Sequence, residues 1–262
     1  MACRARSPSR PLSASVALRS MGVTGNIRDL VKSVVRALGY DVRRIDAHFQ
    51  KRPIDFIRSR NIDVVVDVGA NIGQYAEHLR RAGYKGWIVS VEPVQAVYDV
   101  LAARAAADPR WKVLNLAFGE KSGVAQINVS EASVFSSLHP QSPAATAFNP
   151  EARVLCQETI RIARLDEVFS EFPKGRPFLK IDTQGYEEQV LAGGAGCISE
   201  FFGVQMELPI IHLYEGTWRF HQAVAYMHAR GFEISNIVPV NYDQTDPMSL
   251  LEVDCIFRLG RA

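Results

Sequence analysis

The sequence is poor in cysteine, with only four among 262 residues. They are Cys3, Cys156, Cys197 and Cys255, which lie far apart and form no C-x-x-C pair. This spacing indicates neither a structural zinc site nor a disulfide framework. Scattered cysteines suit a reducing compartment, so we expect the protein in the cytoplasm.

Long hydrophobic runs and a strong excess of one charge are also absent. No uninterrupted apolar run approaches the roughly 20 residues that a membrane-spanning helix needs. The formal net charge is only +2, which argues against a dedicated nucleic-acid surface, and we expect no nucleic-acid partner. The length suits one large α/β domain and is too short for two domains of that class.

The start of the chain has a composition of its own. Residues 1–28 contain five arginines and no acidic residue. We expect residues 1–25 to be a disordered extension, of which residues 1–20 are absent if translation starts at Met21 instead of Met1. A targeting peptide is the alternative.

Residues 26–60 are expected to form a helical segment, because apolar residues recur there at helical spacing. Basic residues accompany them between Ile27 and Arg44. This pattern indicates either contact with an acidic membrane surface or a solvated helix face.

Residues 63–75 are the most informative stretch of the chain. Four valines before Gly69 favour a strand that is buried on both faces. Gly69 and Gly73 allow a tight turn and the close approach of a ligand to the backbone. Apolar residues then recur at helical spacing from Tyr75 to Ala82. The stretch therefore predicts a nucleotide-binding unit of strand, glycine turn and helix.

The glycine spacing and the preceding acid indicate which nucleotide binds. A dinucleotide fingerprint needs a glycine at the position where this chain has Asn71. Asp67, at the end of the strand, repels phosphate and attracts an ammonium or sulfonium group. These features favour S-adenosylmethionine over NAD as the cofactor. Alternatively, Asp67 only caps the turn that follows.

A second expected strand, at residues 87–93, also ends in an acid. A carboxylate at the position of Glu92 lies beside the ribose of an adenosine ligand in a βαβ unit, although a helix cap is the alternative. A third expected strand, at residues 112–116, leads to residues 117–119, where the chain can turn under an adenine ring. The cofactor-binding residues that we expect are Asp67, Gly69, Asn71, Gly73, Tyr75, Glu92, Pro93 and Ala117.

Residues 124–164 break the alternation of strands and helices. Strand patterns at residues 124–129 and 159–162 flank a segment rich in proline, alanine and serine. We expect a hairpin and a mobile lid over the substrate, because long loops in compact domains are usually functional. Its candidate residues are Ser136, Ser137 and His139; for His139, a plain surface position is the alternative.

Two later strands end in acids as well. Asp182 ends the expected strand 178–182, and Glu207 lies in the expected strand 203–208. Ligands of open parallel sheets bind at the carboxyl ends of the strands, so we expect these acids to share an edge with Asp67 and Glu92. Further strands near residues 232–238 and 252–259 are expected to close the sheet as an antiparallel pair.

These motifs together resemble the FkbM family of S-adenosylmethionine-dependent methyltransferases, over about residues 60–259. The resemblance implies an α/β, Rossmann-like seven-strand methyltransferase fold for residues 61–262, with a mostly parallel, doubly wound sheet and a C-terminal antiparallel strand pair. One position departs from the family, since many members have a glutamate where this chain has Gln184. The residues that carry the resemblance are 67–73, 91–93, 179–187, 205–208, 213–216 and 252–257.

The resemblance also implies O-methylation of a hydroxyl. Methyl transfer from a sulfonium needs an aligned nucleophile and a base that removes its proton. Asp182 is our first candidate for the base, and Glu207, His139 and His212 are weaker ones. Asp182 and Glu207 would alternatively hold a divalent cation, and Asp182 alone would cap the next helix. We expect no metal.

The acceptor is expected to be a small molecule or a glycoconjugate, most simply a sugar hydroxyl of a glycolipid. Hydroxyls of polyketides or peptides are the second choice. Two other classes stay open at this point: an NAD(P)-dependent oxidoreductase and a binding protein without turnover.

Overall fold

The computed structural model describes residues 51–211, 213–243, 246 and 248–260. These residues belong to one compact unit. The expectations for the extension at residues 1–25, for the basic segment up to Arg44 and for His212 lie outside the described residues.

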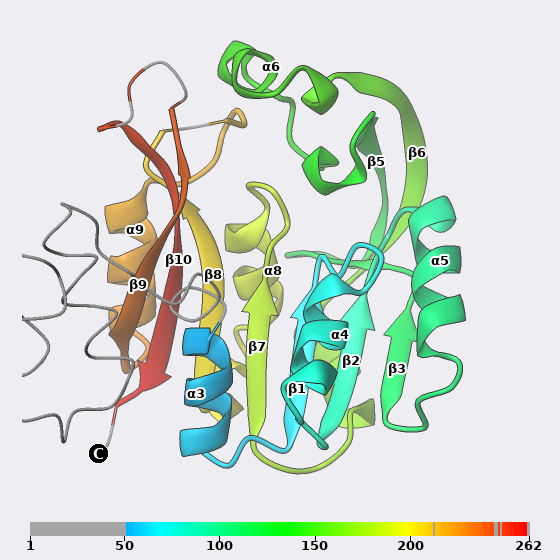
Figure 1. Cartoon of the computed structure of the whole chain (residues 1–262), viewed down its shortest axis with the longest axis vertical. Helices are drawn as coiled ribbons and strands as arrows, with labels where there is room; N and C mark the ends of the chain where they lie inside the picture. Colours follow the sequence, from blue (N-terminus) through cyan, green and yellow to red (C-terminus); the bar gives the residue numbers. More distant parts are fainter. Residues whose placement is uncertain (1–50, 212, 244–245, 247, 261–262) are drawn as a thin grey trace, which may run out of the picture. The chain divides into compact units, whose positions relative to one another are not determined.

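A seven-stranded sheet forms the centre of this unit, in the order β3-β2-β1-β7-β8-β10-β9 (Figure 1). The first five strands pair in parallel, whereas β10 is antiparallel to both of its neighbours, β8 and β9. The predicted Rossmann-like sheet with a C-terminal antiparallel pair is therefore confirmed. The strands are β1 (Val64–Val68), β2 (Trp87–Val91), β3 (Trp111–Leu114), β7 (Pro177–Ile181), β8 (Gly203–Pro209), β9 (Phe232–Tyr242) and β10 (Leu250–Leu259).

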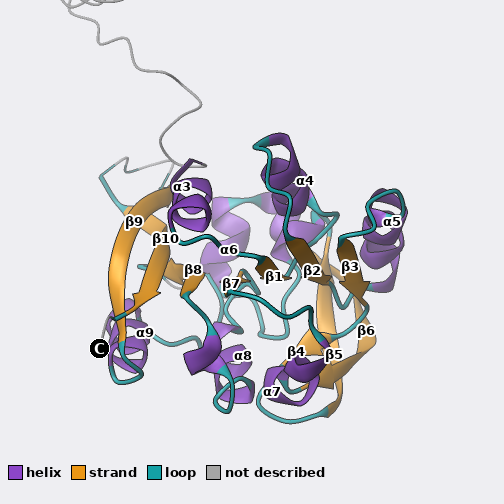
Figure 2. Cartoon of the chain, turned by 90° about the horizontal axis from the view of Figure 1, so that it is seen from below, coloured by secondary structure: helices purple, strands orange, loops and turns teal. Residues whose placement is uncertain are grey.

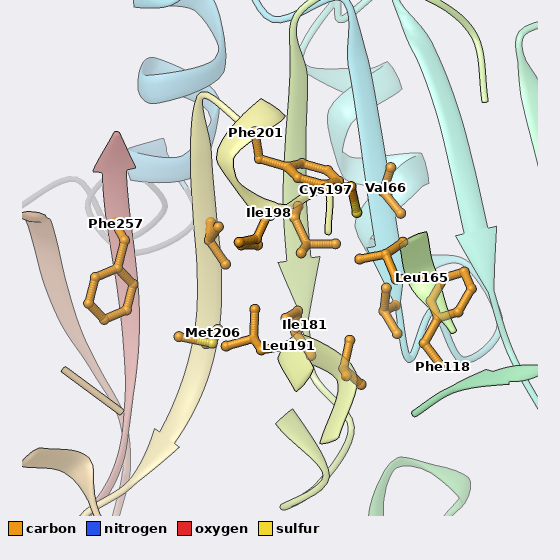
Figure 3. Packing of buried hydrophobic residues seen from close by; sticks show 14 of the residues in the cluster. Val66, Phe118, Leu165, Ile181, Leu191, Cys197, Ile198, Phe201, Met206 and Phe257 are labelled. Atoms are coloured by element: carbon orange, nitrogen blue, oxygen red, sulfur yellow. The ribbon is translucent and has the colours of Figure 1, made fainter. Parts of the chain in front are cut away.

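The central strands are buried on both faces, which is why their sequences are nearly continuous apolar runs. All five residues of β1 and all five of β7 are buried. Side chains alternate along β1, because Val64, Val66 and Val68 pack into one hydrophobic core and Val65 into another. Figure 3 shows part of the first core, with Val66 and Ile181 from neighbouring strands directed into it.

Helices cover both faces of the sheet (Figure 2). Helices α3, α4 and α5 contribute buried residues to the core around Val65, and α8 and α9 contribute to the core around Val66. Ile54 and Ile57 of α3 are buried in the former core, so the end of the expected N-terminal segment 26–60 packs within the same unit as the sheet. The helices are α3 (Lys51–Ser59), α4 (Gln74–Arg81), α5 (Gln95–Ala105), α6 (Pro143–Phe148), α7 (Leu165–Val168), α8 (Glu187–Gly193) and α9 (Phe220–His228).

The insertion forms a second sheet of three strands, in the order β4-β6-β5. Strand β5 (Gly123–Ser130) pairs antiparallel with β6 (Val154–Ala163), as the predicted hairpin requires. Strand β4 (Ala117–Phe118) occupies the place where we expected a turn, and it pairs in parallel with β6. The turn prediction was wrong because Phe118 is fully buried in the main core and the backbone continues into the second sheet.

Residues 131–153, which connect β5 to β6, are called the lid below. They contain α6 and the short 3-10 helices η1 (Ser133–Phe135) and η2 (Pro150–Ala152). Figure 1 shows α6 beyond the tips of the parallel strands, on the side of their carboxyl ends. Two further 3-10 helices, η3 (Phe169–Glu171) and η4 (Ile198–Glu200), lie elsewhere in the chain.

The two-sided burial of β7 gives a stability prediction. Leu179 is 0% exposed in β7, whereas Leu155 on β6 is 58% exposed. Leu179→Ala should lower the free energy of unfolding by about 2–5 kcal/mol, because it leaves a cavity in a close-packed core. Leu155→Ala should change it by no more than about 0.5 kcal/mol. Urea denaturation of both variants is the measurement, and equal losses would contradict the assignment of Leu179 to the core.

Candidate functional site

A cavity of about 400 Å³ opens at the carboxyl edge of the main sheet. Its wall combines the ends of β1, β2, β7 and β8 with the lid and with residues from β9 and β10. None of the described residues that line it is a lysine, an arginine or a histidine. Those residues include Gly69, Asn71, Glu92, Pro93, Leu116, Ala117, Ser133, Phe135, Ser136, Phe148, Asp182, Gln184, Tyr186, Glu207, Asn241 and Glu252.

The glycine turn after β1 forms the floor of this cavity. Gly69 has φ +75°, and a Cβ atom there would lie 1.8 Å from the backbone oxygen of Asp182. Only glycine fits this position, because both the backbone angle and the space exclude a side chain. The N–H groups of Gly69 and Ala70 both donate to the carbonyl of Val91, at 3.0 Å each. The turn is thereby fixed to the ends of β2 and β7.

Glu92 lies beside this turn and is only 6% exposed. Its Oε2 accepts a hydrogen bond from the N–H of Asn71 (3.0 Å), and its Oε1 accepts one from the N–H of Val94 (2.9 Å). Burial raises the pKa of Glu92 to about 7, although both N–H groups act in the opposite direction. Each oxygen keeps a second lone pair for another donor.

Lys180 connects the turn to two acids, and sequence reasoning assigned it no role. Its Nζ lies 3.1 Å from Oδ1 of Asp67 and 3.2 Å from Oδ2 of Asp182, and it donates to the carbonyl of Gly69 at 3.3 Å. The signal that would have found it is a lysine inside a strand whose other residues are apolar. Such a charge has to be paired when it is buried.

Asp67 is the partner that neutralises this lysine. It is fully buried and does not line the cavity, so its carboxylate is directed at Lys180 and not at a ligand. Burial raises the pKa of Asp67, against the lowering effect of the ammonium charge. We expected a cationic ligand beside Asp67. The structure places the ammonium group of Lys180 there instead.

Asp182 and Glu207 are bridged by Gln184. The Nε2 of Gln184 donates to Oδ1 of Asp182 (2.8 Å) and to Oε2 of Glu207 (3.3 Å). The hydroxyl of Tyr214 donates to Oε1 of Gln184 at 2.7 Å and fixes the amide. A glutamate at position 184 would have no amide. The glutamine of this chain therefore supplies the hydrogen-bond donor between the carboxyl groups of Asp182 and Glu207.

The two bridged acids differ in their protonation. Burial would raise the pKa of Asp182, but Lys180 and the Gln184 amide outweigh it and hold that pKa below its ordinary value. Burial and the charge of Asp182 raise the pKa of Glu207 well above its ordinary value. The two shifts have opposite directions, so the negative charge of the pair is held preferentially by Asp182.

The remaining expected residues lie around this centre. Tyr75 lines a second cavity, of about 610 Å³, which shares Gly69, Asn71, Val134, Asp182 and Glu207 with the first. The hydroxyl of Tyr75 donates to Oε1 of Gln205 (3.0 Å). Gly73 precedes the first residue of α4, with φ +93°, and lines neither of these cavities.

His139 also lines neither of the two cavities. Its ring packs against that of Tyr186, with 5.3 Å between the ring centroids, and burial lowers the pKa of the imidazole. The structure therefore does not bring His139 together with Asp182 and Glu207.

Hydrogen bonds attach the lid to the site. The Nδ2 of Asn71 donates to Oγ of Ser133 (2.9 Å), and Oγ of Ser137 donates to the carbonyl of Gln184 (2.7 Å). The hydroxyl of Tyr214 is also within 3.3 Å of the carbonyl of Phe135. Of the expected lid residues, Ser136 lines the cavity and Ser137 anchors the lid to the turn after β7 through Gln184.

Metal clusters and membrane-spanning helices are both absent from the described residues. No group of three or more His, Cys, Asp or Glu among them has the arrangement of a metal site. None of the helices in that part of the chain has the length and hydrophobicity to span a membrane.

The raised pKa of Glu92 predicts a pH dependence of stability. A carboxyl group with a folded pKa near 7 and an unfolded value near 4.5 stabilises the fold at low pH, and that contribution is lost as the pH rises through this window. The loss is about 3 kcal/mol for Glu92. Glu92→Gln should therefore flatten the fall in the free energy of unfolding between pH 5 and pH 8, measured by urea denaturation. The control Glu200→Gln, at an exposed position, should leave the slope of unfolding free energy against pH unchanged. Wild-type and Glu92→Gln curves of equal slope would contradict the raised pKa of Glu92.

The contacts of Lys180 predict a large effect of its removal. Lys180→Met leaves two carboxylates of neighbouring strands without their cation, and breaking a buried pair costs about 3–5 kcal/mol of unfolding free energy. Lys174→Met, at an exposed lysine, is the matched control and should cost less than about 0.5 kcal/mol. Chemical denaturation at pH 7 compares the two, and similar values would show that the buried lysine is dispensable.

Comparison with known proteins adds to this geometry. The protein "Methyltransferase sdnD" of Sordaria araneosa is 24% identical over 232 residues, which cover 75% of this chain and 86% of that protein. The methyltransferase domain of a bacterial CtHen1 has a TM-score of 0.44 at 11% identity, covering 80% of this chain and 97% of that one.

Aeropyrum pernix fibrillarin, solved with natively bound S-adenosyl-L-methionine, has a TM-score of 0.45 at 14% identity, covering 74% of this chain and 66% of that one. A profile of the methyltransferase FkbM domain matches residues 67–234, which is more than half of the chain. The protein therefore belongs to the FkbM methyltransferase family and is an S-adenosylmethionine-dependent methyltransferase.

Proposed function

We propose that this methyltransferase transfers a methyl group to a hydroxyl of a sugar, within a glycolipid or another glycoconjugate. The observation that carries the proposal is that Glu92 and Asp182, from strands on either side of β1, line one cavity together. Glu92 would hold the ribose of the cofactor, and Asp182 would receive the proton of the acceptor hydroxyl. The family resemblance supplies the choice of a sugar.

The residues of the cavity fit S-adenosylmethionine. The backbone of Gly69 leaves room that a Cβ atom would fill, and Glu92 has acceptor capacity left for the two ribose hydroxyls. The absence of Lys, Arg and His from the described lining suits a cationic sulfonium, whereas the pyrophosphate of NAD(P) would find no positive side chain there. Gly69, Asn71, Glu92, Pro93 and Ala117 are the residues that would hold the cofactor.

S-adenosylmethionine, when bound, supplies a methyl group on a positively charged sulfur. Asp182 accepts a hydrogen bond from the acceptor hydroxyl and takes its proton as the new oxygen–carbon bond forms. Lys180 keeps Asp182 ionised for this role. Burial and the charge of Asp182 raise the pKa of Glu207, so Asp182 and not Glu207 is the preferred base. The pair of electrons of the broken sulfur–carbon bond stays on sulfur.

Location and membrane contact are proposed on the sequence alone. We propose a cytoplasmic enzyme whose basic residues between Ile27 and Arg44 touch an acidic membrane surface, where a glycolipid would be available. Those residues lie outside the described part of the chain, so this proposal rests on composition and helical spacing.

Replacing the proposed base gives the first test. Asp182→Asn keeps the shape of the side chain and removes its basicity, so turnover should fall by roughly 10²–10⁴-fold. The affinity for S-adenosylmethionine, measured by calorimetry, should change little. The control Asp99→Asn, at an exposed position on α5, should retain full turnover. Unchanged turnover in the Asp182 variant would assign this residue a structural role.

The acceptor class is tested in cells. Deletion of the gene should remove one methyl group from a sugar of the extracted glycans or glycolipids, seen by mass spectrometry against the parent strain. If a polyketide, a peptide, a protein or an RNA loses the methyl group instead, the sugar assignment is wrong although the methyltransferase assignment stands. A protein that binds the cofactor and methylates no fraction of the extract would be a binding protein.

A further inference from the structure

The cavity extends well beyond the part that fits the cofactor. Glu92 follows β2 and Glu252 lies on β10, and the sheet order places β1, β7 and β8 between these two strands. Neighbouring strands are about 4.8 Å apart, so the two glutamates come from strands roughly 19 Å apart. Asp182, after β7, lies midway. The acceptor therefore belongs in the half of the cavity beyond Asp182, on the side of β8 and β10.

The wall of this acceptor half consists of polar side chains from the main sheet and of phenylalanine side chains from the lid. Glu207, Asn241 and Glu252 come from β8, β9 and β10, and the amide of Asn241 donates to Oε2 of Glu252 at 2.7 Å. Phe135 and Phe148 come from the lid. The carbonyl of Phe135 accepts hydrogen bonds from the side chains of Ser130 and Gln141, so the backbone at this ring is held in place.

The charges of the whole cavity exclude one class of acceptor. Its described lining contains the four carboxyl groups of Glu92, Asp182, Glu207 and Glu252 and no basic side chain. The nearest cation described above, Lys180, lies in the wall of the second cavity and already faces Asp67 and Asp182. A phosphate, sulfate or carboxylate on the acceptor would find no basic partner in this lining and would lie near the carboxylate of Asp182, which weakens its binding.

The same wall suits a ring with many hydroxyls. Carboxyl and carboxamide groups accept and donate hydrogen bonds at neighbouring hydroxyls, and the faces of phenylalanine rings pack against apolar C–H surface. A few polar groups on a largely apolar wall are typical of sites that fix the orientation of a small ligand. An amine on the ring would be accepted as well, because it meets only acids.

We propose that the β8–β10 half of the cavity binds a sugar ring that bears no anionic group, either a neutral sugar or an amino sugar. The inference rests on the proposed function and narrows it, since it excludes uronic acids and sugars esterified with phosphate or sulfate at the methylated residue.

The test uses the full chain and a glycan and lipid extract from a strain that lacks the gene. The extract is incubated with the enzyme and S-adenosylmethionine with a radiolabelled methyl group. The products are cleaved to monosaccharides under conditions that retain phosphate and sulfate esters, and they are then separated by charge. We expect the label on a neutral or cationic sugar, and label on an anionic sugar overturns the inference.

The outcomes separate this inference from the proposed function. Label on an anionic sugar contradicts the inference but leaves the proposed function standing. Label on a compound that contains no sugar removes both, and so does an enzyme that binds the cofactor in calorimetry but labels nothing in the extract.

Two variants of Glu252 locate the selectivity in this half of the cavity. Glu252→Lys adds a cation, so the ratio of rates with uronic-acid and neutral acceptors should rise at least about tenfold. Glu252→Gln keeps the shape and the bond from Asn241 in case the lysine variant does not fold, and it should raise the acceptor KM without changing cofactor affinity. Glu200→Lys, at an exposed site, is the matched control and should change neither quantity. Unaltered acceptor KM in Glu252→Gln, with unaltered selectivity, overturns the placement of the sugar.

Discussion

The ammonium group of Lys180 is the interaction on which the site depends. It joins the carbonyl of the glycine turn, the buried Asp67 and the half-buried Asp182 at distances between 3.1 and 3.3 Å. Removing an ammonium from water costs several kcal/mol, and three oxygen partners are needed to offset that cost. The glycine turn and the carboxylate of Asp182 are thus held by one cation, so neither can move without disturbing the other.

The lid and the loop around Tyr214 extend this arrangement outward. Gln184 stands between them, because its amide binds both acids and accepts from Tyr214, and its backbone carbonyl accepts from Ser137. Its φ of +55° is a conformation that non-glycine residues seldom adopt, which the surrounding contacts maintain. A residue that departs from the family pattern therefore contacts Asp182, Glu207 and the lid together.

Much of the fold follows from the sequence, because valine-rich strands that end in acids have few alternative arrangements. The valines before Gly69 and the acids Glu92 and Asp182 identified the correct edge of the sheet. The contacts of Lys180 were not predictable, since its partners are set by the pairing of β1 with β7 and not by spacing along the chain. The turn expected at Ala117 failed for a similar reason, because β4 exists only through its pairing with the distant β6. Phe135 and Phe148 reach the site through a lid without sequence periodicity.

The position of β10 has a consequence for how the enzyme becomes active as it is made. This strand is the last one along the described chain, yet it lies between β8 and β9, so β9 has no place in the sheet until β10 has emerged from the ribosome. The glycine turn, Glu92 and Asp182 are all synthesised earlier. A nascent chain can therefore assemble the half that fits the cofactor while the opposite wall, with Asn241 and Glu252, is still missing. The wall that contains Asn241 and Glu252 is thus the last part of the described cavity lining to be synthesised.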